Sequence, residues 1–111
     1  MIEINVGRDF SRFPAGRLRK DGDSSAERFR EDYLLPPLKR GESVRVILDG
    51  TRGFPSSFLE EAFGGLVRSA GISLPQLYDQ LEIVAVSEVF KPYALRAMGF
   101  IDAQSKRNAA V

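Results

Sequence analysis

Runs of apolar residues predict where the strands of this chain lie. Residues 2–6 alternate between apolar and polar side chains, which is the period of a half-buried strand. Residues 44–49 and 81–86 are almost continuously apolar and rich in β-branched side chains, a pattern typical of strands buried on both faces of an α/β sheet. Residues 17–19 are expected to form a short strand that returns beside the first in an antiparallel hairpin.

Apolar residues at helical spacing predict three helices. The first opens at residues 24–27, where a serine and a glutamate three positions apart form a capping box, and it is expected to end at the proline pair, residues 36–37. The second covers about residues 58–70 and opens with a similar box at residues 57–60. The third covers residues 93–104.

Strands that alternate with helices predict a single α/β domain. We expect a mixed, four-stranded sheet with an N-terminal hairpin and about three helices. The chain has 111 residues, of which 43% are hydrophobic, and this suits one domain with a packed core. The domain is expected to cover residues 1–104, and residues 105–111 are expected to form a flexible C-terminal tail.

The residue types that are missing exclude several kinds of site. The chain has no histidine and no cysteine, so it cannot form a Ser-His or Cys-His dyad, a disulfide, or an imidazole or thiolate metal site. We therefore expect a protein that is not an enzyme and binds no metal or cofactor. No signal-peptide pattern is visible, and no apolar stretch approaches the ~20 residues of a membrane span, so a cytoplasmic protein without membrane contact is expected.

Charge gives little indication of nucleic-acid binding. The net charge is +1, from 16 basic and 15 acidic residues, and this creates no broad attractive field. Residues 8–20 are locally basic, which leaves a nucleic-acid contact as an alternative. A solvated segment that pairs with the acidic residues in 21–32 is favoured, because nucleic-acid interfaces need a more basic domain with interleaved aromatic residues.

A glycine-rich loop between the strand at residues 44–49 and the second helix carries the most informative pattern. Asp49 ends the strand, and Ser56 and Ser57 stand where the helix begins. A helix N-terminus has unpaired N–H groups and a partial positive charge, so it stabilises a phosphate or another anion, and Arg52 is near in sequence. Two interpretations stay open: the serines are helix caps only, or they are caps that also have a regulatory role.

Two further pairs lie inside the second predicted helix. Gly64 and Gly65 each cost ~1 kcal/mol relative to alanine there, which indicates close approach of the helix to the sheet or of a partner to the helix. Glu60 and Glu61 could be paired carboxylates for acid–base catalysis. Because neighbouring side chains on a helix do not face each other, a structural role is favoured, with Glu60 in the capping box.

The stretch from residue 46 to 66, Val-Ile-Leu-Asp-Gly-Thr-Arg-Gly-Phe-Pro-Ser-Ser-Phe-Leu-Glu-Glu-Ala-Phe-Gly-Gly-Leu, resembles the STAS domain, the fold of anti-sigma-factor antagonists. It is most similar to uncharacterised STAS-like relatives, and residues 13–17 and 27–30 extend the resemblance over most of the chain. In STAS proteins a serine in this loop is phosphorylated by a partner ATPase-type kinase. The usual Asp-Ser-Ser-Gly pattern is changed at Pro55 and Phe58.

The resemblance implies a regulatory, protein-interaction module whose partner is a histidine-kinase-type ATPase. Ser56 and Ser57 are the implied phosphorylation candidates. The expected partner- or anion-binding residues are Asp49, Thr51, Arg52, Gly64 and Gly65. The alternative is a small-ligand or nucleotide-binding domain that uses the helix N-terminus and Arg52. Homodimerisation is also open, because a small single core is marginal alone.

Overall fold

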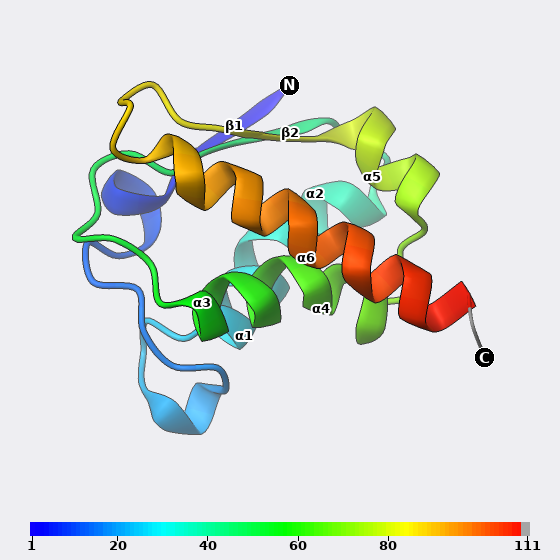
Figure 1. Ribbon diagram of the computed structural model, residues 1–111, viewed down its shortest axis with the longest axis horizontal. Helices are drawn as coiled ribbons and strands as arrows, with labels where there is room; N and C mark the ends of the chain where they lie inside the picture. Colours follow the sequence, from blue (N-terminus) through cyan, green and yellow to red (C-terminus); the bar gives the residue numbers. More distant parts are fainter. Residues whose placement is uncertain (110–111) are drawn as a thin grey trace.

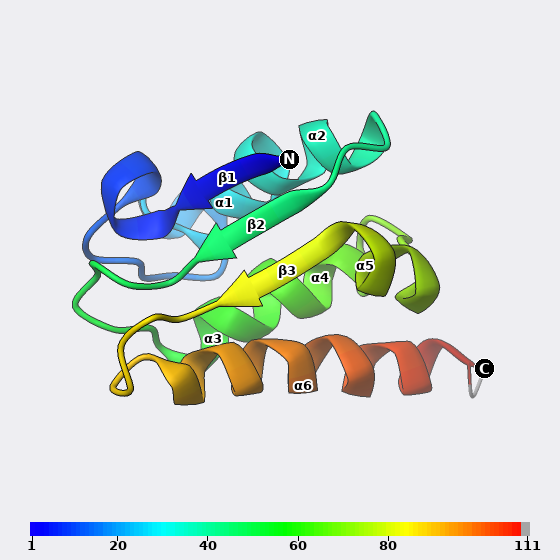
Figure 2. The same ribbon diagram turned by 90° about the horizontal axis from the view of Figure 1, so that it is seen from above.

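Three parallel strands form the sheet of this protein. The computed structural model describes residues 1–109, and its strands β1 (Ile2–Asn5), β2 (Val44–Ile47) and β3 (Leu81–Val84) lie side by side in that order (Figures 1 and 2). The α/β class is therefore confirmed. The expected fourth strand and mixed sheet are wrong, because both strand pairs are parallel.

The segment predicted as the returning strand of a hairpin is a loop. Residues 17–19 lead into the 3-10 turn η2 (Arg19–Asp21), and the Leu18 N–H donates to the carboxylate of Asp21 at 2.9 Å. The Asp21 carboxylate therefore accepts the N–H that a neighbouring strand would accept if Leu18 lay in a sheet. β1 is followed instead by the π-helical turn η1 (Val6–Phe10).

The first helical run passes through the proline pair at which it was expected to end. It consists of α1 (Ala26–Phe29), the π-helical turn η3 (Arg30–Leu34) and α2 (Leu35–Lys39). The prolines fall in the first turn of α2, where a missing N–H costs little. Ser25 is the N-cap and accepts a hydrogen bond from the Arg28 N–H at 3.2 Å, one position after the predicted box.

More helices follow than the three that were expected. A second run comprises α3 (Ser56–Leu59), the π-helical turn η4 (Glu60–Gly64) and α4 (Gly65–Arg68) and lies below the sheet in Figure 1, whereas the additional helix α5 (Leu74–Gln80) lies at the end of the strands and precedes β3. The last helix, α6, covers Lys91–Ala109. It therefore runs through residues 105–109 of the predicted tail, and residues 110–111 lie outside the described part.

The sheet has one covered and one open face, which corrects the expectation of strands buried on both sides. Val44 and Val46 of β2 are fully buried, whereas Arg45 between them points to the other face. There it lies in register with Glu3 and Glu82 and pairs with both carboxylates, at 3.7 and 3.4 Å. A helix layer thus packs on one face only.

An aromatic cluster fills the space between the covered face and the helices. Phe29, Phe58 and Phe63 are fully buried, with ring centroids 6.2 Å apart between Phe29 and Phe58 and 6.4 Å apart between Phe29 and Phe63. Burial of such a side chain stabilises the fold by about 1.5–3 kcal/mol. Because Phe58 belongs to the first turn of α3, the core fixes where that helix begins.

Candidate functional site

The loops that follow the three strands meet at one end of the sheet. All three strands point to this end, and α3 and α6 both start there (Figure 2). Open α/β sheets place their ligand sites at the carboxyl ends of the strands. The predicted residues from Asp49 to Ser57 therefore lie where the fold favours binding.

Asp49 holds two of these loops together. One carboxylate oxygen accepts the N–H of Val86 at 2.8 Å, and the other accepts the N–H of Ser87 at 2.9 Å. The carboxylate thus connects the end of β2 to the loop after β3. Within residues 1–109 no cluster of three or more acidic, histidine or cysteine side chains could hold a metal ion.

The glycine-rich loop is folded by Thr51 and attached to the chain through Arg52. The Thr51 hydroxyl accepts the N–H of Gly53 at 3.1 Å, and the backbone N–H of Arg52 donates to the carbonyl of Arg12 at 2.8 Å. The exposed guanidinium of Arg52 lies 5.9 Å from the centre of the Phe13 ring. Thr51 therefore shapes the loop, and Arg52 presents a positive charge to solvent.

Ser56 and Ser57 open the helix without capping it. Pro55 is the N-cap, its carbonyl accepts the N–H groups of Phe58 and Leu59 at 3.0 and 3.2 Å, and within residues 1–109 no side chain caps this N-terminus. The predicted capping box is wrong, because the helix begins at Ser56 itself. Ser56 is exposed and Ser57 is half-buried, so the Ser56 hydroxyl is the more accessible one.

An open hollow lies beside the start of α3. It measures about 390 Å³ and is lined by residues of three segments: Phe13, Pro14, Ala15, Arg52, Gly53, Phe54, Pro55 and Tyr93. Gly53 has a φ of +107°, and a Cβ there would lie 2.8 Å from the Tyr93 hydroxyl, so only glycine fits. Sequence reasoning did not identify Phe13 or Tyr93 as site residues, because nothing in their spacing links them to Arg52.

Gly64 and Gly65 are buried, so the structure does not place them for contact with a partner. A Cβ on Gly65 would overlap the guanidinium of Arg30, and a Cβ on Gly64 would lie 2.8 Å from Oε2 of Glu60 and at an ordinary contact distance of 3.5 Å from the carbonyl of Phe100 in α6. Gly65 therefore allows close approach of Arg30, and Gly64 leaves room for the carboxylate of Glu60. Close approach of the helix to the sheet, one of the two reasons suggested by the sequence, does not explain the two glycines.

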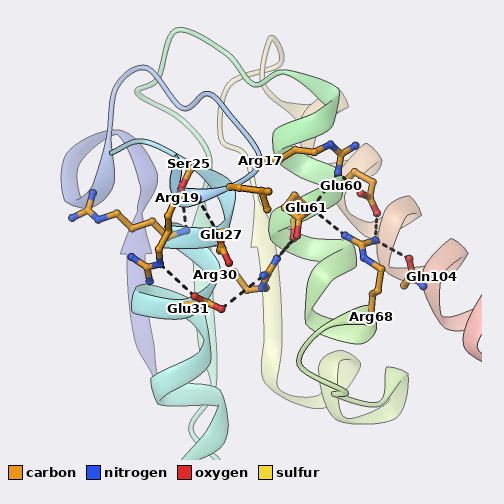
Figure 3. Close-up of polar contacts among 12 residues, drawn as sticks. Arg17, Arg19, Ser25, Glu27, Arg30, Glu31, Glu60, Glu61, Arg68 and Gln104 are labelled. Atoms are coloured by element: carbon orange, nitrogen blue, oxygen red, sulfur yellow. Dashed lines mark hydrogen bonds and ion pairs between the residues drawn. The ribbon is translucent and has the colours of Figure 1, made fainter. Parts of the chain in front are cut away.

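Arg30 and Glu61 form a buried ion pair behind the start of α3 (Figure 3). Arg30 is 3% exposed, and its Nη1 donates to the Glu61 carboxylate at 2.8 Å and to the Glu61 carbonyl at 2.6 Å. A buried charge needs such a partner, because its hydration is lost on folding. This pair fastens the first helical run to the second.

Glu60 extends the ionic contacts to two more parts of the chain (Figure 3). It pairs with Arg17 at 2.7 Å and with Arg68 at 2.5 Å, and Arg68 also donates to Gln104 of α6 at 2.9 Å. Burial opposes the charge on Glu60, but the hydrogen bonds from Arg68 and Arg17 outweigh it and hold the pKa of Glu60 below its ordinary value. Glu60 is thus a charge-paired structural group.

The basic segment of residues 8–20 divides between two sets of partners. Arg19 pairs with Asp32 at 2.6 Å and with Glu31 at 3.4 Å, which is the pairing expected from the sequence. Arg17 instead reaches Glu60 across the fold. Arg17 and Arg19 are therefore neutralised by carboxylates of this chain, one across the fold and one nearby, while Arg12 and Lys20 have no ion pair within residues 1–109.

Comparison with known proteins identifies one family. A family model described as a STAS-like domain of unknown function matches residues 25–89, more than half of the chain. This range contains the loop from Asp49 to Ser57 and the Arg30–Glu61 pair. No curated protein and no solved structure matches this chain. Among residues 1–109, none of the helices combines the length and the apolar character that crossing a membrane requires.

Proposed function

This chain belongs to the family of STAS-like domains of unknown function, and from that premise we propose that it is a non-enzymatic regulatory module that binds a protein partner at the start of α3. The observation that carries the proposal is the position of Ser56. Its exposed side chain stands at the first residue of a long helical run, and within residues 1–109 no side chain caps that N-terminus.

Phosphorylation of Ser56 is the proposed switch. The Ser56 oxygen would attack the γ-phosphorus of ATP held by a histidine-kinase-type ATPase. The hydroxyl proton would pass to a base of that partner, and ADP would leave. The product adds about −1.5 to −2 charge where free N–H groups and the helix dipole stabilise an anion. The folded domain therefore tolerates this phosphate, while the charge of its docking face changes sign locally.

A binding experiment with two Ser56 variants tests the switch. The tagged protein is used to capture a histidine-kinase-type ATPase from an extract of its own source cells, and the captured protein is identified by mass spectrometry. Ser56→Ala is expected to bind like the wild type, and Ser56→Asp is expected to lose binding. The matched control is Ser69→Asp, an exposed position just beyond the other end of the same helical run, which should bind normally. Equal binding by all variants would contradict the switch.

A small-ligand site at Arg52 is the second candidate, and the shape of the hollow argues against it. Ligand pockets bury most of a small molecule, whereas this hollow is wide open to solvent. Thermal unfolding with inorganic phosphate, ADP and ATP separates the two functions, because a ligand that binds only the folded state raises the Tm. A rise of several degrees with one compound would favour the small-ligand function.

A further inference from the structure

We propose that the hollow beside Ser56 is an anchor site for an acidic segment of the partner protein that carries a large apolar or aromatic side chain. The inference rests on the proposed function for its premise that a protein docks at the start of α3. It adds the chemistry of the docking segment and the residues that bind it.

The walls of the hollow are apolar and partly unprotected from water. The Phe13 side chain is 63% exposed, although a phenylalanine gains free energy by burial. Phe54 also lines the hollow and is buried, with its ring centroid 5.4 Å from that of Tyr93. An inserted aromatic or aliphatic side chain would cover Phe13 and contact Tyr93. Such pockets are the usual receptors of interface hot-spot residues.

One lining arginine and two arginines next to lining residues make the surroundings of the hollow positive, and they are called its rim arginines. Arg52 lies 5.9 Å from the centre of the Phe13 ring, and Arg96 lies 5.8 Å from the centre of the Tyr93 ring. Arg12 precedes Phe13, and its carbonyl accepts the backbone N–H of Arg52. All three arginines are exposed. A peptide with carboxylates on both sides of its anchor would complement this rim.

Several other surface arginines are paired with carboxylates, and these rim arginines are not. Arg17, Arg19 and Arg45 each bridge two carboxylates. Within the described residues, by contrast, Arg12, Arg52 and Arg96 form no ion pair. Paired arginines have little left to offer an acidic ligand, whereas these three arginines keep their charge available. Within residues 1–109, Lys20, Lys39, Lys106 and Arg107 form no ion pair either, so what sets the hollow apart is that its free arginines lie beside exposed apolar side chains.

The size and openness of the hollow favour a side chain of a docked protein. About 390 Å³ accommodates one large side chain, and the open rim leaves room for the backbone that carries it. Arginines above aromatic rings already gain from the contact, and they retain N–H donors at the edge for carboxylates. The arrangement thus offers apolar contact at the centre and charge at the rim, as protein interfaces do.

The position of Pro55 connects the anchor site to the proposed switch. Pro55 lines the hollow and directly precedes Ser56. A phosphate on Ser56 would place negative charge beside the rim, where it repels acidic side chains and attracts the same arginines. Phosphorylation would therefore expel an acidic segment, which gives the switch a direct electrostatic cause.

Selection from a library of random peptides displayed on phage tests the proposal on the full chain. We expect the wild type to enrich peptides that have an aromatic or large aliphatic residue flanked by aspartate or glutamate. The affinity of the best peptide is then measured by fluorescence anisotropy. Phe13→Ala and Arg52→Glu should each weaken it by about tenfold or more, since hot-spot contacts are lost. Both residues are exposed, so the variants should fold normally, which circular dichroism checks.

Two control variants match these changes on a distant part of the surface. Tyr78→Ala removes an exposed aromatic ring from α5, and Lys39→Glu reverses an exposed charge at the end of α2. Both should bind the peptide like the wild type. Failure to enrich any peptide, enrichment of peptides without acidic residues, or equal losses in the control variants would overturn the anchor site.

The anchor site and the proposed switch can fail separately. If the selected peptide binds Ser56→Asp as tightly as the wild type, the anchor site stands and its link to phosphorylation is refuted. If no acidic peptide is enriched while Ser56→Asp still loses the ATPase, the switch stands and the anchor site is refuted.

Discussion

The guanidinium of Arg30 occupies the space that the missing side chain of Gly65 leaves free. The arginine comes from the first helical run and the glycine from the second, and Glu61 receives the charge one helical turn before that glycine. A glycine in a buried helix is thereby explained by a buried cation. The relationship makes the size of residue 65 a determinant of stability.

Gly65→Ala should destabilise the protein. The added methyl group would overlap Arg30 and force the guanidinium away from Glu61. Overpacking alone costs about 1–3 kcal/mol, while the gain in helix propensity offsets ~1 kcal/mol. With the weakened ion pair included, we expect the free energy of unfolding to fall by about 2 kcal/mol. Urea denaturation measures this value.

Gly99→Ala is the matched control and should have the opposite effect. Gly99 is exposed in α6, and no atom lies within 4 Å of the position that a Cβ would take. Only the propensity gain remains, so the free energy of unfolding should rise by about 0.5–1 kcal/mol. A similar change in both variants would show that the space over Gly65 is not filled by Arg30 in solution.

Glu60 should make the protein sensitive to acid. Its pKa is lowered in the folded state, so the unfolded chain takes up the proton first. The stabilisation is complete above the ordinary glutamate pKa of about 4.3 and is lost as the pH falls through the lower, folded-state value. Glu60→Gln should therefore lose less stability than the wild type between neutral pH and about pH 3. Parallel losses in urea titrations of the two proteins would refute this role.

The sequence predicted three strands correctly because their apolar residues are the ones that the sheet buries. Residues 2–6, 44–49 and 81–86 contain β1, β2 and β3, because β-branched residues pack well on a covered sheet face. Residues 17–19 also alternate between polar and apolar side chains, but in the structure they lead into a turn and pair with no strand. Three residues carry too little pattern to distinguish a strand from a turn.

The buried ionic pair could not be predicted in the same way. Arginine is almost never fully buried unless it is paired, and its partner Glu61 lies 31 residues further along the chain. The local signal was present at Gly64 and Gly65, which showed that something approaches the helix closely. The glycines did not indicate which side chain or element packs against the helix. Tertiary packing, rather than any local preference, selects Arg30 for that position.

The open sheet face offers a test of charge pairing across strands. Arg45 lies between Glu3 and Glu82, so Arg45→Glu would place three carboxylates in register. We expect a loss of about 1 kcal/mol at low salt, because like charges on adjacent strands repel. The loss should shrink at about 0.5 M salt, where screening is strong. Arg45→Gln removes the attraction without adding repulsion and should lose less. Equal losses at both salt concentrations would attribute the effect to packing.

Asp49 should stabilise the loop after β3 directly, and it should affect partner binding only through the conformation of that loop. Asp49→Asn keeps the shape but leaves one oxygen to accept the N–H groups of Val86 and Ser87, so the free energy of unfolding should fall by about 1–2 kcal/mol. Amide hydrogen exchange at these two residues should accelerate. Asp23→Asn, an exposed control, should change neither quantity. Unchanged exchange at Val86 and Ser87 together with lost partner binding would instead make Asp49 a direct contact of the partner.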